Sequence, residues 1–360
     1  MTLSDRLNAF SALGLFLEKS VTLDFEANTE EIQTLCFSAK AKNAWFLPQN
    51  TLIMLKSISK MLEKDNLQTW IDKYNFPEIQ ENSEQKPKKI GVVMAGNIPA
   101  VGFHDALCVL LSGHILHAKL SSDDQLIIPF LLKKLISFLP EIKKNIHFVE
   151  RMNEVDAIIA TGSDNTARYF EYYFAKKPHI IRKNRHSVAI FNGKETKEDF
   201  LKLGEDIFTY FGLGCRNVAK LYVPKDYEKN DGFVPFYDTI QVFEDVYIHN
   251  KYANNYDYNK AIYLIKKIPH YDNNFLIISE STEIASPIAM LFYEFYDNEA
   301  HLAEIIRKNE EKIQCIVSKD AFFKLDNEKL ENSFGFGQAQ QPRLHDYADG
   351  VDTMAFLKDL

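Results

Sequence analysis

The segment FGLGCRNV places Cys215 in a turn that two glycines open, Gly212 and Gly214. The thiolate form of cysteine is a strong nucleophile, and it needs a lowered pKa or a nearby positive charge. Arg216, the next residue, is a candidate for that charge, although a solvated surface side chain explains an arginine there equally well. Cys215 is therefore the candidate for covalent chemistry in this chain.

The other three cysteines lie in apolar surroundings. Cys36 falls in TLCFSA, Cys108 in ALCVLL and Cys315 in IQCIVS, and each is typical of a small buried hydrophobic residue. Four cysteines without CxxC spacing in a chain of this size predict neither a disulfide framework nor a zinc site.

Three loops that follow expected strands carry polar residues. MAGNIPAVGFHD contains Asn97, KLSS contains Lys119, and ATGSDNTARYF contains Gly162 and Ser163 before a helix. The N-terminal amides of a helix can bind a phosphate. Each loop taken alone is also explained by ordinary turn chemistry. His104, in the first loop, could relay a proton, but a lone histidine near a site is more often structural.

The elements that must position these loops follow from the hydrophobic pattern. Residues 1–80 predict helices, because apolar side chains recur three and four positions apart. Further along, apolar strands are expected at 88–96, 114–120, 145–150, 156–162, 179–183 and 187–193. Helical patterns at 100–111, 123–138 and 165–174 alternate with them. This alternation predicts a Rossmann-type parallel sheet, which binds nucleotides at the carboxyl ends of its strands.

The length of 360 residues predicts more than one domain. The polar, proline-broken tract at 79–89 marks a junction after the helices, and a second α/β segment begins near Lys197. We expect an N-terminal and cofactor-binding domain at 1–185, a catalytic α/β domain at 186–330, and an irregular tail at 331–360 that packs back on the domains.

Composition excludes several classes of function. The net charge of −8 argues against nonspecific nucleic-acid binding. No apolar run approaches the roughly 20 residues of a membrane helix, and the first residues form an amphipathic helical pattern rather than a signal peptide. We therefore expect a soluble, cytoplasmic protein.

The motifs together resemble the aldehyde dehydrogenase superfamily. More closely, GNIPAVGFHD, ATGSDNTARYFEYYF, FGLGCRNV, KYANNYDYNKA and DYADGVDTM resemble the acyl-CoA reductases related to the reductase component of bacterial luminescence fatty-acid reductase. The resemblance runs from about residue 87 to the end of the sequence. It implies an aldehyde-dehydrogenase-like fold and NAD(P)H-dependent reduction of an acyl thioester, fatty acyl-CoA above all, to an aldehyde.

The resemblance also implies roles for single residues. Cys215 matches the nucleophile, and Asn97 matches the asparagine whose amide forms an oxyanion hole with the cysteine N–H. Lys119 matches the lysine that holds the adenosine ribose.

Two further elements of the family concern the cofactor. Gly162 and Ser163 match the turn against the pyrophosphate. Glu283, in TEIASPIAMLF, matches the glutamate that holds the nicotinamide ribose, although only Glu283 and Pro287 of that E-x-F-G-P element are retained.

The sequence departs from the superfamily at two places. Arg182, in IIRKNRHSV, stands where hydrolytic members carry a glutamate general base, and arginine cannot activate water. The same arginine is a second candidate for the positive charge near the thiol. Ser121 and Ser122 stand where NAD-preferring members have a carboxylate, which favours NADPH over NADH, although Asp123 and Asp124 follow closely.

Alternatives remain at this stage. An aldehyde dehydrogenase working oxidatively would release acid from an aldehyde, and Arg182 argues against it. A noncatalytic subunit that binds an acyl-transferring or acyl-activating protein would leave NADPH unchanged with every acyl-CoA. The donor could be acyl-CoA or an acyl-protein thioester.

Overall fold

The computed structural model describes residues 1–360 except 77–85, 163, 228–231, 322, 325–329 and 331. The predicted junction at 79–89 lies largely outside the described residues. The chain forms two compact units, one of residues 1–183 with 343–360 and one of residues 184–342. The expected tail is therefore divided between them: its first part belongs to the second unit and its last eighteen residues, 343–360, belong to the first.

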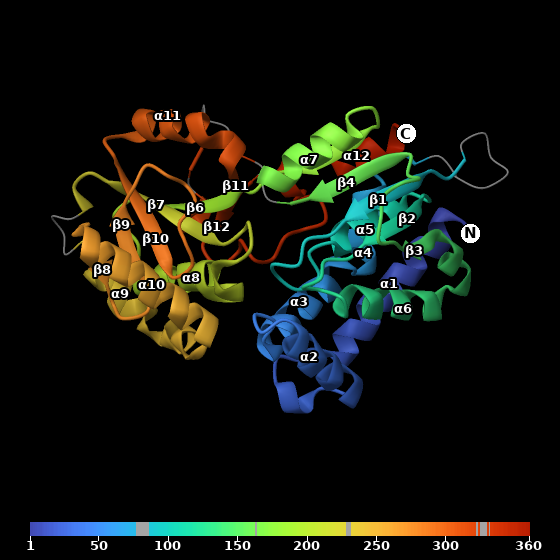
Figure 1. Ribbon diagram of the computed structural model, residues 1–360, viewed down its shortest axis with the longest axis horizontal. Helices are drawn as coiled ribbons and strands as arrows, with labels where there is room; N and C mark the ends of the chain where they lie inside the picture. The colour runs from blue at the N-terminus through green and yellow to red at the C-terminus, as the bar shows by residue number, and fades with distance from the viewer. Residues whose placement is uncertain (77–85, 163, 228–231, 322, 325–329, 331) are drawn as a thin grey trace. The chain divides into compact units, whose positions relative to one another are not determined.

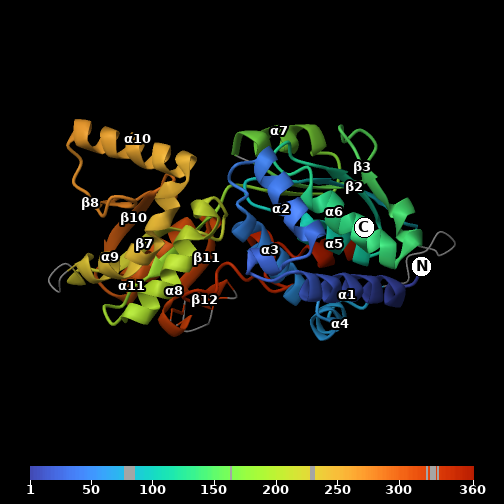
Figure 2. The same ribbon diagram turned by 90° about the horizontal axis from the view of Figure 1, so that it is seen from below.

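The first unit begins with four helices (Figures 1 and 2). Their bounds are α1 Leu3–Ser20, α2 Glu30–Lys42, α3 Pro48–Met61 and α4 Lys64–Ile71. A capping box between Thr2 and Asp5 starts α1. Phe10, Leu13 and Leu17 then fall on one buried face of this helix. Figure 2 shows α1 alongside α3 and α4, against which it packs.

A five-stranded parallel sheet forms the centre of the first unit. Its strands lie in the order β3-β2-β1-β4-β5. Their bounds are β1 Lys89–Val93, β2 Ile115–Lys119, β3 Ile146–Phe148, β4 Ala157–Thr161 and β5 His179–Arg182. The connecting helices are α5 Phe103–Leu111, α6 Ile127–Phe138 and α7 Asp164–Phe174. The strand order reverses at β1, where such sheets place their ligands.

The second unit contains a seven-stranded sheet in the order β12-β11-β6-β7-β10-β9-β8, parallel except for β8. The strands are β6 His186–Ile190, β7 Val218–Pro224, β8 Tyr271–Asp272, β9 Ile277–Glu280, β10 Met290–Tyr296, β11 Ile313–Ser318 and β12 Ser333–Gly335. The helices are α8 Lys197–Phe208, α9 Val234–Ile240, α10 Asn250–Lys266 and α11 Glu299–Asn309. Figure 1 shows α11 on one face of this sheet and α8 and α9 on the other. Each face has its own apolar core.

The tail is more regular than expected. Residues 333–335 pair with β11 as an edge strand, and Thr353–Lys358 form helix α12 against α5. The predicted mixed α/β fold class with a Rossmann-type sheet is confirmed. No helix in the described part of the chain is long and apolar enough to cross a bilayer.

Candidate active site

Cys215 lies in a tight turn between the end of α8 and the start of β7. Its thiol is exposed, whereas Cys36, Cys108 and Cys315 are buried, and none of the four is in a disulfide. The chain enters the turn through Tyr210, Phe211 and Gly212, which have φ angles of 55°, 59° and 76°. Two bulky residues in the left-handed region carry a conformational cost that the surrounding contacts must offset.

Asn217 closes the turn from inside. Its backbone N–H donates to the Gly214 carbonyl at 3.0 Å, and its side-chain Oδ1 accepts from the Gly214 N–H at 2.9 Å. The Asn217 Nδ2 group donates to the last carbonyls of α8, those of Asp206 and Ile207, and to that of Thr209. One buried amide therefore satisfies the helix end and fixes the residue before Cys215.

The residue after the thiol is also fixed. Arg216 Nε donates to the Ala339 carbonyl, and its guanidinium lies 4.9 Å from the centre of the Phe334 ring. Ser187 Oγ, from β6, donates to the Cys215 carbonyl at 3.1 Å and accepts from the Cys315 N–H. The side chain of Arg216 is thus fixed by a hydrogen bond and by packing, and its role as a positive charge for the thiol stays a prediction.

Glu283, expected to bind the nicotinamide ribose, lies exposed in the loop between β9 and β10. The next residue, Ile284, is buried in the core beneath α11 and holds this loop in place. Nearby, the buried Lys220 of β7 forms an ion pair with Glu294 of β10. Burial lowers the pKa of Lys220, whereas Glu294 and then Glu283 raise it. Glu283 is therefore close enough to the buried Lys220 ammonium group to raise its pKa.

In the first unit, the loops after the neighbouring strands β1 and β2 meet, and β1 borders the point where the strand order reverses, between β1 and β4. Asn97 and Lys119 are both exposed there. Gly96 approaches Ser121 so closely that a Cβ on it would lie 2.6 Å from the Ser121 Oγ. The structure therefore brings the predicted oxyanion-hole loop and the predicted cofactor loop together within one unit.

The two aspartates after these serines have different environments. Asp124 is buried, and its carboxylate accepts from the Ala100 N–H at 2.8 Å and the Ile127 N–H at 3.2 Å. Burial raises the pKa of Asp124, against those two bonds. Asp123 is exposed, as is Ser122, and the Asp123 N–H donates to Ser121 Oγ. Asp124 is thus a structural clamp, and only Asp123 is placed to meet a ligand.

The predicted pyrophosphate turn is described only in part. Gly162 is half-buried directly after β4, and α7 begins two residues later. Ser163 lies outside the described residues. Gly162 therefore stands at the carboxyl end of β4, next to β1.

Arg182 has a structural role that the sequence did not predict. Its guanidinium binds Asp105 of α5 through two bonds of 2.5 and 2.8 Å and donates to Thr353 Oγ1 at 2.9 Å. All three groups belong to the first unit, and Arg182 is only 4% exposed. Arg182 is therefore held by Asp105 and Thr353 within the first unit, and its role as a positive charge for the thiol stays a prediction.

His104 is fixed in a similar way. Its Nε2 lies 2.9 Å from the Leu344 carbonyl, and its ring packs between Trp70 and Tyr347. Burial lowers the pKa of His104, so the ring is neutral at neutral pH. These contacts favour the structural reading of His104 over the proton relay.

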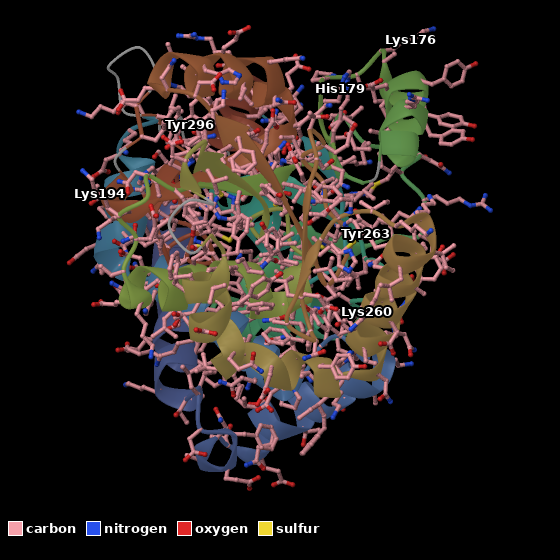
Figure 3. The ribbon with its side chains drawn as sticks, turned by 90° about the vertical axis from the view of Figure 1, so that its left-hand side faces the viewer. Lys176, His179, Lys194, Lys260, Tyr263 and Tyr296 are labelled. Carbon is pink, nitrogen blue, oxygen red and sulfur yellow. The ribbon has the colours of Figure 1, made fainter. Side chains whose placement is uncertain are left out.

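The polar segment KYANNYDYNKA forms most of α10 and anchors this helix. Tyr256 Oη donates to Asp272 at 2.5 Å, and Lys260 Nζ binds the same carboxylate at 2.7 Å. Figure 3 shows Lys260 and Tyr263 on this helix. Asn259 donates to the Ile288 carbonyl, in the segment that precedes β10. Tyr256 and Asn259 therefore anchor α10 on its sheet.

Sequence reasoning missed three residues that hold the Cys215 turn: Ser187, Asp206 and Asn217. Asn217 lay inside the motif FGLGCRNV, but α8 ends at Phe208, well before it, so its position in the sequence does not mark it as the residue that caps this helix. Ser187 and Asp206 bind partners more than one hundred residues away in sequence, and no local pattern marks them.

The chain has the aldehyde dehydrogenase fold. A crystal structure of a putative aldehyde dehydrogenase from Burkholderia cenocepacia matches with a TM-score of 0.62 and 12% identity, over 89% of this chain and 74% of that one. The Mycobacterium tuberculosis aldehyde dehydrogenase complexed with NAD+ matches with 0.60 and 13%, over 88% and 73%. Aldehyde dehydrogenase 21 from Physcomitrella patens, in complex with succinate, matches with 0.63 and 14%, over 100% and 84%.

Within this class, the family is defined by sequence. The chain belongs to the acyl-CoA reductase (LuxC) family, whose model matches residues 40–231. This confirms the resemblance that the motifs indicated and makes the protein a member of an oxidoreductase family. No curated protein sequence matches the chain.

Proposed function

We propose that the protein reduces an acyl thioester, fatty acyl-CoA in the first place, to an aldehyde through an acyl group carried on Cys215. The observation that carries this proposal is an exposed thiol held in a fixed turn, in a chain of the acyl-CoA reductase family. The other three cysteines are buried and inaccessible to an acyl chain.

The Cys215 thiolate attacks the thioester carbonyl, and the C–S bond to CoA breaks, so CoA departs as a thiolate and takes up a proton. Asn97 stabilises the oxyanion by donating its amide, a role that preorganised donors perform in acyl transfer. The resulting acyl group on Cys215 accepts a hydride, and the thiohemiacetal collapses to aldehyde and regenerates the thiolate. Loss of the Asn97 amide should slow acylation about 10²- to 10³-fold.

A nicotinamide cofactor fits the residues of the first unit. Exposed Lys119 and the Ser121 and Ser122 hydroxyls stand beside the reversal point of the sheet, and this donor set suits a ribose or its 2′-phosphate. The bound cofactor would supply the hydride. NAD+ in the Mycobacterium tuberculosis relative supports the cofactor class, and the two serines favour NADPH. Glu283 would hold the nicotinamide ribose.

The matched test compares Cys215→Ala with Cys36→Ala, a buried cysteine of α2. We expect Cys215→Ala to lose acyl-CoA-dependent NADPH oxidation while Cys36→Ala retains it. Wild-type enzyme should give aldehyde and not acid. Retained reduction in Cys215→Ala would exclude the mechanism, acid release from aldehyde would favour the oxidative alternative, and unchanged NADPH with every acyl thioester would favour a noncatalytic subunit.

A further inference from the structure

Asp206 is a buried carboxyl group that the proposed chemistry does not use, and it lies next to the Cys215 turn. It belongs to the last turn of α8 and is 0% exposed. Its Oδ2 accepts from the Gly337 N–H at 2.6 Å, and its Oδ1 accepts from the Ala339 N–H at 3.0 Å. Two backbone N–H groups of the 335–341 segment therefore donate to the same Asp206 carboxylate.

The same segment holds the residue that follows the thiol. The Ala339 peptide receives Asp206 on its N–H side, and its carbonyl accepts from Arg216 Nε. Arg216 also lies over Phe334, at the start of the same stretch of chain. A continuous path of hydrogen bonds thus runs from Asp206 through Ala339 to Arg216.

Asp206 also reaches the residue before the thiol. Its backbone carbonyl accepts from Asn217 Nδ2 at 3.0 Å, and Asn217 Oδ1 accepts from the Gly214 N–H. Gly337 has a φ of 81°, so a side chain there would be strained. On this side the contact is a backbone carbonyl, which any residue at 206 would supply. The Asp206 carboxylate therefore acts on the turn through the 335–341 segment and Arg216.

We propose that Asp206 is a positioning residue for Cys215: as a carboxylate it holds the 335–341 segment, and this segment fixes through Arg216 the turn that presents the thiol. The proposal deepens the proposed function, since it takes Cys215 as the nucleophile. A carboxylate can accept both N–H bonds at once, whereas the protonated acid must donate through one of its oxygens. Protonation of Asp206 should therefore loosen one of the two attachments.

The charged surroundings allow this protonation to occur near neutral pH. Burial raises the pKa of Asp206 to about 7, against the Gly337 and Ala339 N–H donors, which lower it. Glu205 of the same helix raises it further, and Arg216 from the turn lowers it. The 335–341 segment contributes only backbone donors and neutral side chains. We expect Cys215 to be presented well above pH 7 and less well below it.

The experiment measures the acylation rate of Cys215 by decanoyl-CoA without cofactor, as CoA release and as adduct mass, across pH. The wild-type acylation rate should fall as pH drops through about 7, the pKa of Asp206, and this fall is the acid limb of the pH profile. Asp206→Asn, which replaces one acceptor oxygen by a donor, should acylate about tenfold more slowly with unchanged affinity for the acyl-CoA, and should lack this limb. Glu205→Gln should keep the wild-type rate at high pH and move the limb to lower pH.

A wild-type rate and pH profile in folded Asp206→Asn would overturn the proposal. If this variant does not fold, Arg216→Met decides, because it keeps packing on Phe334 but lacks the Nε donor, and an unchanged profile there would equally overturn it. If wild type accepts no acyl group from decanoyl-CoA, the proposed function fails instead. The role of Asp206 is then tested by the rate at which iodoacetamide alkylates Cys215, because this reaction needs no substrate. The alkylation rate should show the same pH dependence in wild type and the same loss of it in Asp206→Asn.

Discussion

At the scale of single residues, the environment decides which groups can react. Burial raises the pKa of Cys36 to about 11 and that of Cys108 well above its usual value, so these thiols stay protonated. Cys215 is exposed, and its turn is held by Ser187, Arg216 and Asn217. The thiols of Cys36 and Cys108 are therefore unreactive, whereas that of Cys215 is accessible to a reagent.

This contrast predicts selective labelling. In the native protein, iodoacetamide should modify Cys215 at least tenfold faster than Cys36 or Cys108, because alkylation needs an accessible thiolate. Peptide mapping after short exposure measures the rates, and denatured protein, where all four cysteines should react, is the control. Comparable labelling of Cys36 in the folded protein would contradict the burial of this residue.

The Arg182–Asp105 pair predicts a large stability effect. Asp105→Ala should lower the free energy of unfolding by about 3–5 kcal/mol, because it leaves a buried guanidinium uncompensated. Urea denaturation measures it. Glu198→Ala, which breaks the exposed pair with Lys202 on α8, is the control and should change stability little. Equal losses in both variants would contradict the buried pairing.

Asp206 predicts a pH dependence of stability. Its pKa is about 7 in the folded protein and 3.8 in the unfolded reference, so between these values the folded state retains a proton that the unfolded state loses. Stability should therefore fall as pH rises from about 4 to 7, by up to about 4 kcal/mol, and level off above. Urea titrations should show this slope in wild type and lose it in Asp206→Asn. An identical slope in the two proteins would contradict a raised pKa at this site.

At the scale of elements, the C-terminal segment illustrates what periodicity cannot reveal. Trp70 Nε1 donates to Tyr347 Oη, Tyr74 bonds the same hydroxyl at 2.7 Å, and His104 and His114 reach the carbonyls of Leu344 and Leu357. These bonds tie 343–360 to the first unit although they join residues far apart in sequence. The motif DYADGVDTM indicated the family. Its structural role depends on residues of the first unit that lie far away in sequence, and no local sequence pattern predicts them.

The Tyr347 hydroxyl supplies a direct test of this attachment. Tyr347→Phe should lower the free energy of unfolding by about 1–3 kcal/mol, because the buried Trp70 N–H loses its acceptor. Tyr258→Phe, on an exposed part of α10, should have little effect. Chemical denaturation of both variants decides, and an unchanged midpoint for Tyr347→Phe would mean that the segment is held by packing alone.

The sequence was most informative where pattern and chemistry are local. Apolar strands alternating with helices predicted the Rossmann-type sheet, and strand-end positions predicted the loops of Asn97 and Lys119. Partner choice was not predictable: Arg182 pairs with Asp105 across 77 residues, and Asp206 binds Ala339 across 133. Such contacts depend on how strands are ordered in space, which short-range patterns do not encode.

At the scale of the whole molecule, the residues proposed for catalysis are divided between the two compact units. Cys215 and Glu283 belong to the second, and Asn97, Lys119 and Gly162 belong to the first. Each unit carries its own sheet and core, so the reaction that we propose draws its nucleophile and its cofactor from separately stabilised parts. This division predicts that cofactor binding can be changed while the thiol remains intact.

Coenzyme choice tests this separation. Asp123→Asn removes the exposed carboxylate beside Ser121, which would repel a 2′-phosphate, so kcat/KM for NADPH should rise about fivefold while that for NADH changes little. A charge interaction of about 1 kcal/mol in water corresponds to this factor. Labelling of Cys215 should be unaffected. A gain for NADH in place of NADPH would contradict the assigned position of the phosphate.

The most direct test of the central claim is a single-turnover chase on the wild-type enzyme. Enzyme mixed with decanoyl-CoA in the absence of cofactor should release one equivalent of CoA and carry the acyl mass on the Cys215 peptide. Addition of NADPH should then remove that mass and yield decanal. An adduct absent from Cys215, or one that disappears as decanoic acid, would contradict the account.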